Sequence, residues 1–427
     1  MIFATLFKRG AVAYQLGSTV LSQALLSAAN FFVAFILLRR LGDDQYGYYV
    51  LASVTLLLVA SLQGAYFQPP IVVELARRGL AERKAFMGGL VGGRSRLVWG
   101  LALVVIVAQL VAWISNLISS QIEALLLAGS VSGIAVLFRE FFRGVLLAYH
   151  RTQDVLRGDI AYVVLLLGSV FIVTLFPQAT VLAIASVGLS ALCSALILSR
   201  AAWRFEPWDL KGSLSAIRDI RAQGVWSVFG AAVHWTFSQG YTYIVAAMLD
   251  VRAVAALAAT RLLLMPINVI SSGANQSTFP LLSRWHEQIG FVATFRRTVR
   301  ISTALVALFG VYVGLVWIFR GWLFNVLIHK SADHQDILII IWSAIFLVMT
   351  IRDQFVSLLS VRARLEAVSK FTFASAVLAV FSIWFAIPMY GPAGALVGIL
   401  VGELFNVAGL LLLSTLEIRR ARAEVIA

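Results

Sequence analysis

The chain has 427 residues, of which 61% are hydrophobic and only 13% are charged, and its mean hydropathy is +0.92. A soluble protein of this length carries about twice that share of charged residues, so the composition excludes an ordinary soluble globular protein. The formal net charge of +14 does not indicate nucleic-acid binding, because basic residues gather in the cytoplasmic loops of membrane proteins. No nucleic-acid partner is expected.

Apolar blocks follow one another along the chain, each of about 20 residues and therefore long enough to cross a hydrocarbon core of ~30 Å as a helix. We predict an all-α polytopic membrane protein with about twelve transmembrane helices in the lipid bilayer. The first apolar run is too long for a cleavable signal peptide, so it is expected to be retained. In chain order, the predicted spans are 14–38, 46–72, 97–115, 122–148, 157–176, 179–199, 223–248, 254–283, 300–319, 336–361, 367–388 and 391–415.

The segments between these spans alternate in their content of Lys and Arg. Most of the 34 basic residues fall on one side, among them Lys8 and Arg9 before the first span and Arg94 and Arg96 before the third. Because Lys and Arg are concentrated in cytoplasmic segments, both termini are predicted to be cytoplasmic.

An internal repeat links the two halves of the chain. The stretch VLFREFFRGVLLAYHRTQ matches MTIRDQFVSLLSVRARLE 213 positions later, so that Arg139 aligns with Arg352 and Glu140 with Asp353. Repeats with an even number of spans share one topology, and such parallel repeats are a transporter architecture with the substrate near the midplane between them. We predict two pseudo-symmetric six-helix lobes around a central cavity, at residues 1–200 and 223–427, joined by a cytoplasmic amphipathic linker at 201–222.

Four arginines, Arg139, Arg143, Arg261 and Arg352, lie inside predicted spans. Each would cost at least ~2.5–3.5 kcal/mol if it faced lipid, so they are expected to face protein or water. They could line a cavity for an anionic substrate, since arginine binds phosphate in a two-point fashion, or they could form ion pairs between helices. Arg139 and Glu140 point to different sides of a helix, whereas Glu140 and Arg143 are spaced to pair. Arg261 has no nearby acid and favours the substrate interpretation.

Two corresponding spans carry amides and prolines among apolar residues. Gln63 and Gln68 precede Pro69 and Pro70 in the first half, and Pro280 follows the amides of the second half. Paired interruptions of this kind indicate a transport site, and the alternative is kinked helices whose amides satisfy freed backbone groups. The amide residues that we consider candidates for substrate binding are Gln63, Gln68, Asn275, Gln276 and, with a weaker signal, Asn30.

Four other titratable residues are candidates for ion coupling or ion pairing. They are Glu140, Asp353, His234 and Glu403. Glu403 follows a ridge of small residues, Gly394, Gly398 and Gly402, that predicts close packing against a neighbouring helix. Asp159 lies near the start of a predicted span and is expected at the membrane interface.

Two motifs resemble those of bacterial polysaccharide transporters of the Wzx type, within the multidrug/oligosaccharidyl-lipid/polysaccharide (MOP) exporter superfamily. The first hairpin contains LGDDQYG at residues 41–47, similar to that family's first loop, and YGPAGALVGILVGE at 390–403 is similar to its last helix. The resemblance implies a flippase in the bacterial inner membrane that moves polyprenyl-diphosphate-linked oligosaccharide from the inner to the outer leaflet. It also implies basic residues facing the diphosphate and possible partners in the polysaccharide polymerase and export machinery.

Two rival functions stay open. A cation-coupled exporter of small molecules, as in the drug-exporting branch of that superfamily, often carries acidic residues in the first lobe, and no acid interrupts the first span here. A membrane glycosyltransferase, polymerase or ligase usually needs a sizeable outer loop, and the longest outer segment, at 320–335, is short. We find no nucleotide-binding, metal-binding or hydrolase motif. No catalytic residue, metal or cofactor is therefore expected.

Overall fold

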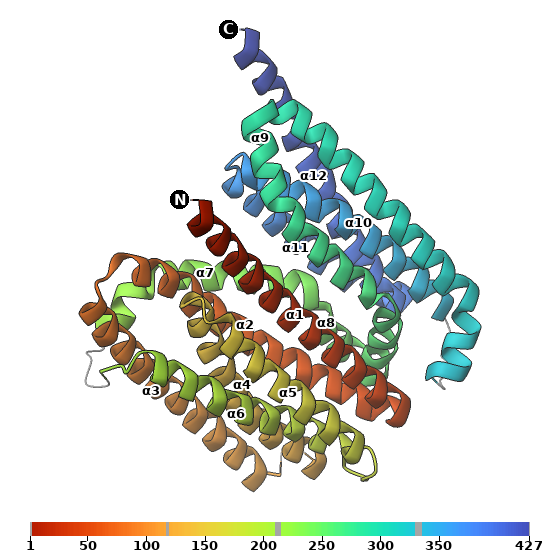
Figure 1. Cartoon of the computed structure of the whole chain (residues 1–427). Coiled ribbons are helices and arrows are strands. Elements are labelled where there is room, and N and C mark those ends of the chain that lie inside the picture. Colours follow the sequence, from red (N-terminus) through yellow and green to blue (C-terminus); the bar gives the residue numbers. More distant parts are fainter. Residues whose placement is uncertain (1, 117–118, 210–214, 329–334, 427) are drawn as a thin grey trace. The chain divides into compact units, whose positions relative to one another are not determined.

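The computed structural model describes residues 2–116, 119–209, 215–328 and 335–426, without the side chains of 2–16, 215, 276–277, 327–328, 422 and 424–426. The described residues form helices and short connections, with no strand among them (Figure 1). The helices are α1 (Ile2–Arg40), α2 (Asp43–Arg77), α3 (Leu80–Ile114), α4 (Ser120–Ala148), α5 (Thr152–Val173), α6 (Ala179–Phe205), α7 (Ser215–Gln239), α8 (Tyr241–Met248), α9 (Val251–Trp322), a π-helical segment η1 (Leu323–Ile328), α10 (Gln335–Val361), α11 (Leu365–Tyr390) and α12 (Pro392–Ile426).

The predicted all-α class is confirmed, and each predicted span falls on helical residues, although the bounds of several helices differ from the prediction. In the described part of the chain, 10 helices are long and apolar enough to cross a membrane. One of these ten is α9, which contains two predicted spans. The chain is therefore a multi-pass membrane protein.

The differences from the predicted spans have local causes. The spans predicted at 254–283 and 300–319 are the two arms of α9, which is broken at Gly290, where φ is 75°. Only glycine adopts that conformation without strain. The seventh predicted span is divided at Gly240 into α7 and α8, and α7 is not among the ten apolar helices.

The third helix begins well before the predicted span, at Leu80 rather than 97. Its first turns bury Phe86, Met87, Leu90 and Val91. These residues recur at helical spacing, so they form an apolar face that packs into the core of this half of the chain. The predicted loop around Arg94 is consequently helical.

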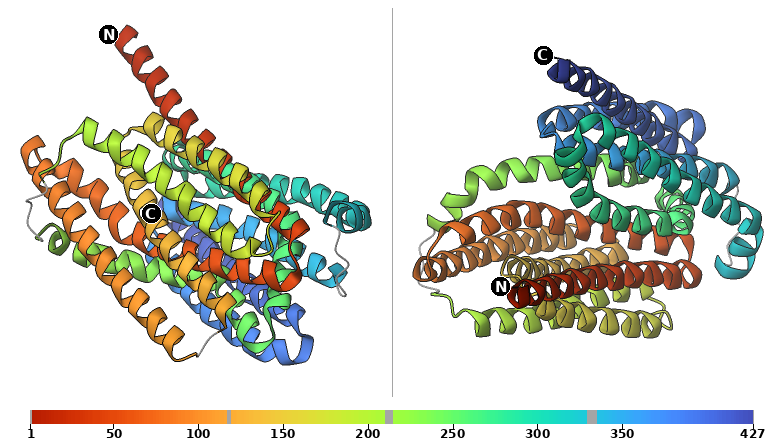
Figure 2. Two further views of the ribbon diagram at one scale, coloured as in Figure 1. Left: turned by 90° about the horizontal axis from the view of Figure 1, so that it is seen from below. Right: turned by 45° about the horizontal axis from the view of Figure 1, so that its top comes forward.

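The chain divides into two compact units, Met1–Ala232 and Val233–Ala427. In the first unit α4 packs against α2 and α6, and in the second unit α10 packs against α9 and α12. The further views in Figure 2 show the helices of each unit lying alongside one another in a bundle. The charged stretches singled out by the repeat thus lie on the central helix of their units, which explains why their arginines are buried.

The turn that follows each central helix supports the repeat at atomic detail. His150 and Ala363, 213 positions apart, both have positive φ, at 56° and 59°. The next residue, an arginine in both units, donates its backbone N–H to a carbonyl one turn back: Arg151 to Leu146 at 2.8 Å and Arg364 to Leu359 at 3.0 Å. The alignment is therefore confirmed at this turn, which directs two matching arginines to the ends of α5 and α11.

The connection after α6 belongs to the first unit. The side chain of Trp208 is only 5% exposed. Its ring lies parallel to that of Phe142 on α4, at 6.4 Å, and 5.0 Å from that of Trp203 on α6. The backbone N–H of Asp209 donates to the carbonyl of Lys84 on α3. This part of the linker is thus packed on the unit rather than lying free on a membrane surface.

The predicted glycine ridge of α12 is confirmed. A Cβ added at Gly394 would lie 2.2 Å from the carbonyl oxygen of Ala386, and one added at Gly398 would lie 2.5 Å from the backbone nitrogen of Ile383. Both neighbours belong to α11, so the absence of a side chain allows the two backbones to approach closely.

Replacing Gly398 by alanine is expected to destabilise the second unit by about 1–3 kcal/mol, because the methyl group would push α11 and α12 apart. The matched control is Gly314→Ala on α9, where nothing lies within 4 Å of the added Cβ. That change is expected to be neutral or slightly stabilising. Unfolding in detergent monitored by circular dichroism checks both, and equal melting temperatures for the two variants would contradict the close contact.

Candidate functional site

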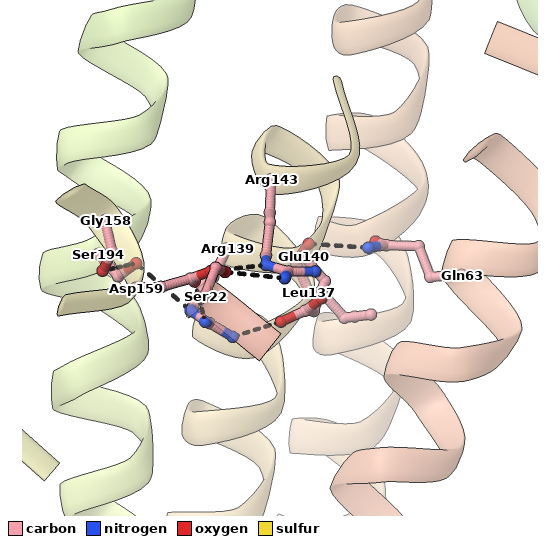
Figure 3. Close-up of polar contacts among 9 residues, drawn as sticks. All are labelled: Ser22, Gln63, Leu137, Arg139, Glu140, Arg143, Gly158, Asp159 and Ser194. Carbon is pink, nitrogen blue, oxygen red and sulfur yellow. Dashed lines mark hydrogen bonds and ion pairs between the residues drawn. The ribbon is translucent and has the colours of Figure 1, made fainter. Parts of the chain in front are cut away.

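A buried cluster of charges connects several helices of the first unit (Figure 3). Its centre is Asp159 on α5, whose side chain is 0% exposed. One carboxylate oxygen accepts from Arg139 at 2.5 Å, and the other accepts from Arg143 at 3.0 Å. Ser22 on α1 donates its hydroxyl to the same carboxylate. A single carboxylate thus joins α1, α4 and α5.

The guanidinium of Arg139 is contacted by several neighbouring side chains. Besides Asp159 it bonds the neighbouring Glu140 and donates to the hydroxyl of Ser194 on α6 at 3.3 Å. Its guanidinium lies 4.0 Å from the ring centroid of Tyr162. Ser194 in turn donates to the carbonyl of Gly158 at 2.8 Å. These contacts satisfy a buried cation whose desolvation would otherwise be costly.

Asp159 lies two turns after the start of α5 at Thr152 and is fully buried in the unit. One expectation about this cluster was wrong. Arg139 and Glu140 do pair, because the long arginine side chain turns back toward its neighbour, and Arg143 pairs with Asp159 instead of Glu140. The net charge of the two arginines and two acids is zero.

The second unit contains a corresponding cluster around Arg352 on α10. Two of its nitrogens donate to one carboxylate oxygen of Asp353, at 3.0 and 2.9 Å. A third nitrogen bonds one carboxylate oxygen of Glu403 on α12. Arg352 and Glu403 are buried, whereas the side chain of Asp353 is 28% exposed. In each unit the repeated arginine therefore connects the central helix to another helix, α4 to α5 in the first unit and α10 to α12 in the second.

The second cluster has one arginine for two carboxylates. The other oxygen of Glu403 is buried and has no hydrogen-bond partner among the described residues. Both amide atoms of Asn406, one turn further along α12, are in the same situation. A buried polar atom without a hydrogen-bond partner costs free energy. Helix packing alone therefore does not explain why polar residues occupy positions 403 and 406.

A cleft of about 460 Å³ opens beside this cluster, within the second unit. That volume lies within the range of small-ligand sites. Ser272, Asn275 and Phe279 recur on one face of α9, and Asp353 and Ser357 lie one turn apart on α10. The described lining is completed by Pro280. Ser357 donates to the side-chain oxygen of Asn275 at 2.6 Å, which leaves the amide nitrogen of Asn275 available to a ligand.

The cleft joins two predicted candidates, Asn275 and Asp353, but no predicted arginine. The described lining residues include a carboxylate and no cation. The neighbouring Arg352 points to Asp353 and Glu403 rather than into open space. The cationic lining predicted from the sequence is therefore not formed by this arginine.

Of the four predicted arginines, Arg261 alone has no acidic partner among the described residues. It donates to the side-chain oxygen of Gln239 at 2.9 Å and to the hydroxyl of Tyr241 at 3.2 Å. The ring of Trp342 lies 5.4 Å away. Neutral polar groups and an aromatic face thus surround its guanidinium, and no acid among the described residues compensates its charge.

The glutamines of α2 have structural partners. Gln63 donates to the carbonyl of Leu137 at 2.8 Å and accepts twice from Arg94, at 3.1 and 2.9 Å. Gln68 packs against Gly144 on α4, and a Cβ added at Gly144 would lie 2.8 Å from the side chain of Gln68. These contacts favour helix packing rather than substrate binding.

Arg94 is a buried arginine that the sequence placed in a loop. It is 1% exposed, and its guanidinium lies 4.4 and 4.6 Å from the rings of Phe138 and Phe141. Those rings lie one turn apart on α4. Their contact with Arg94 could be predicted only by knowing that α3 begins at Leu80 and that Arg94 is therefore helical. Arg94 is thus a functional candidate that sequence reasoning missed.

Asn30 is exposed on α1, whereas His234 on α7 lies close enough to Arg352 and Asp353 to interact with them electrostatically. The side chain of Gln276 lies outside the described residues. The predicted helix interruptions are wrong as breaks, because α2 continues through Pro69 and Pro70, as α9 does through Pro280. Neighbouring helices and side chains can satisfy the backbone groups that a proline frees.

No family model and no curated protein matches this sequence. Solved structures do match. A multidrug resistance MATE family transporter of the MOP superfamily, in an inward-facing conformation, has a TM-score of 0.71 at 14% identity and covers 92% of this chain and 95% of its own. The lipid II flippase MurJ, in an inward closed conformation, has a TM-score of 0.67 at 12% identity and covers 94% and 87%.

A third match is MATE in complex with MaL6, with a TM-score of 0.62 at 13% identity and 97% of both chains covered. At such identities the likeness concerns the fold. The chain has the fold of the MATE and MurJ transporters, over nearly its whole length.

Proposed function

We propose that this protein is a flippase that moves polyprenyl-diphosphate-linked oligosaccharide from the cytoplasmic to the outer leaflet of a bacterial inner membrane, by alternating access. Two solved structures support a transporter, and one of them, MurJ, is a flippase of a lipid-linked molecule. The LGDDQYG and GPAGALVGILVGE motifs add the resemblance to polysaccharide transporters. Both termini would be cytoplasmic, as the distribution of Lys and Arg predicts.

The observation that carries the proposal is the cleft between α9 and α10. Its lining combines hydroxyls, an amide, a carboxylate already bonded to Arg352, and the exposed ring of Phe279. Hydroxyl groups of a sugar can both donate to and accept from such groups, and an aromatic face packs against the apolar side of a ring. The cleft therefore fits the glycan rather than the diphosphate.

The diphosphate would need cationic partners elsewhere. Arg261, whose described partners are neutral, is the residue that we propose for this contact. Arg139, Arg143 and Arg352 are instead engaged by buried carboxylates, which supports the ion-pair interpretation for them. Polysaccharide polymerase and export proteins remain proposed partners.

The test uses sealed vesicles that contain the purified protein and a labelled polyprenyl-diphosphate oligosaccharide. Exposure of the sugar on the far side, detected by a membrane-impermeant lectin, is expected with the protein and not in empty vesicles. If the glycan is instead elongated or transferred, the protein belongs to the enzyme class. If the sugar stays on its own side, the flippase proposal fails.

A variant pair tests the cleft. Asn275→Leu removes the amide that faces the cleft, and it is expected to lower transport about tenfold or more, because a site built for hydroxyls is left with unpaired groups. Thr372→Val on α11, outside the lining, bonds only its own helix and is expected to leave transport unchanged. Equal transport rates in the two folded variants would mean that the substrate does not pass through the cleft.

A second candidate function is cation-coupled export of small molecules, which the likeness to a multidrug resistance MATE family transporter supports. The observation that favours it is the same cleft, where the partly exposed Asp353 lies near the exposed Phe279. A carboxylate and an aromatic face can also hold an organic cation. The two candidates differ in cargo, so a direct comparison of cargoes separates them.

A further inference from the structure

Three arginines surround one carboxylate at the end of the second unit where α10 turns into α11. Glu417 on α12 accepts from Arg362 at 3.3 Å, from Arg364 at 2.9 Å and from Arg420 at 2.8 Å. The reversed turn at Ala363 brings the first two arginines to the same side as α12. We call this set, Arg362, Arg364, Arg420 and Glu417, the arginine cluster.

The two exposed arginines of the cluster, Arg364 and Arg420, share the single carboxylate of Glu417. Their combined positive charge therefore exceeds the negative charge of that carboxylate. The side chain of Glu417 is 4% exposed, whereas those of Arg364 and Arg420 are 43% and 59% exposed. The acid therefore lies beneath and fixes the arginines, and what reaches the surface is guanidinium.

Each exposed guanidinium has N–H donors that its bond to Glu417 does not use. Arg364 uses its Nε for Glu417, and Arg420 uses one terminal nitrogen. A guanidinium has five N–H donors in a planar fork, so both retain donors for a second acceptor. Fixing the side chains in advance reduces the entropy that a ligand must spend on ordering them.

The first unit builds a similar arrangement at the matching turn. Asp154, with a side chain 9% exposed, pairs with Arg151 at 2.6 Å and with Arg157 at 3.3 Å, and these arginines are 45% and 72% exposed. Arg151 corresponds to Arg364 in the repeat. The buried acid comes from α5 in one unit and from α12 in the other. The feature that the two units share is an exposed arginine paired with a buried carboxylate.

We propose that the arginine cluster is a binding site for the phosphate of a lipid head group. Phosphate presents several acceptor oxygens in a geometry that matches the guanidinium fork. The cluster lies at the ends of helices on the side that the distribution of Lys and Arg predicts to be cytoplasmic, and the cytoplasmic leaflet holds anionic lipids. The lipid is either an anionic phospholipid or a polyprenyl diphosphate, since both offer the same chemistry.

The test measures lipid binding to the full-length protein in detergent by native mass spectrometry, with phosphatidylglycerol and polyprenyl diphosphate as separate probes. Arg364→Gln with Arg420→Gln is expected to weaken binding of at least one probe about twenty-fivefold, from a factor of about five for each arginine. The probe that weakens identifies the lipid.

The matched control removes two exposed basic residues outside the arginine cluster, Arg300→Gln with Lys370→Gln. This control is expected to change binding less than twofold. Equal losses in the two double variants would mean a diffuse positive surface and would overturn the site, as would unchanged binding of both probes. If the first double variant does not fold, Arg420→Gln alone, at an exposed side chain, gives the same comparison against Lys370→Gln. The result does not depend on transport, so it is separable from the flippase proposal.

Discussion

Replacing Asp159 by alanine is expected to lower the free energy of unfolding of the first unit by about 3–5 kcal/mol. The carboxylate is fully buried and bonds Arg139, Arg143 and Ser22. Its removal leaves two guanidiniums with Glu140 alone, and a buried charge without its partner is expensive. Chemical unfolding of the purified protein in detergent measures the loss.

The control for this change is Asp336→Ala, which removes the acid of an exposed pair with Arg320. The side chains of that pair are 38% and 57% exposed, and such pairs contribute ~0–1 kcal/mol. Similar stabilities for the two variants would show that Asp159 is not the centre of the first unit, and the cationic-lining interpretation of Arg139 would return.

Replacing Arg352 by alanine is expected to have an effect of the same size in the second unit, about 3–5 kcal/mol. The change leaves Asp353 and Glu403 without their shared cation, and Glu403 already has one oxygen without a partner. Removing Glu403 as well, in Arg352→Ala with Glu403→Ala, is expected to restore part of the stability because no deeply buried carboxylate remains.

A double-mutant cycle makes this prediction quantitative. The double variant is expected to be less destabilised than the sum of the single variants by about 1–3 kcal/mol, as is usual for residues in one network. Additive losses would mean that Arg352 and Glu403 do not interact in the folded protein. In that case Arg352 would be free to face a substrate.

The spans were predictable because a bilayer demands long apolar blocks, and twelve such blocks stand out in the sequence. The breaks were not, because they depend on single residues. The positive φ at Gly290 divides α9, and Gly240 separates α7 from α8. The early start of α3 was missed because the charges around Arg94 look like a loop, whereas Phe86 and Leu90 bury an apolar face.

The arginines at the centre of each unit were predictable, but their partners were not. A charge inside an apolar span is costly enough to indicate a special environment, which identified Arg139 and Arg352. Which acid completes the pair depends on how helices distant in sequence are rotated toward each other. Asp159 comes from α5 in one unit and Glu403 from α12 in the other, so the repeat alone could not reveal them.

The cleft shows the same limit for binding residues. Asn275 was recognised by its place near Pro280, and Asp353 by the repeat, yet their shared cleft follows from the packing of α9 on α10. Ser272, Phe279 and Ser357 carry no signal of their own in the sequence. They line the cleft because they are spaced one and two turns apart on helices that pack against each other.

The most direct test of the proposed function compares two cargoes in the same sealed vesicles. The labelled polyprenyl-diphosphate oligosaccharide and a fluorescent organic cation would be followed side by side, with each offered as competitor to the other. Our account predicts that the glycan crosses, that the cation does not, and that an excess of cation leaves glycan transport unchanged. Transport of the cation with no movement of the glycan would contradict the account and identify a small-molecule exporter.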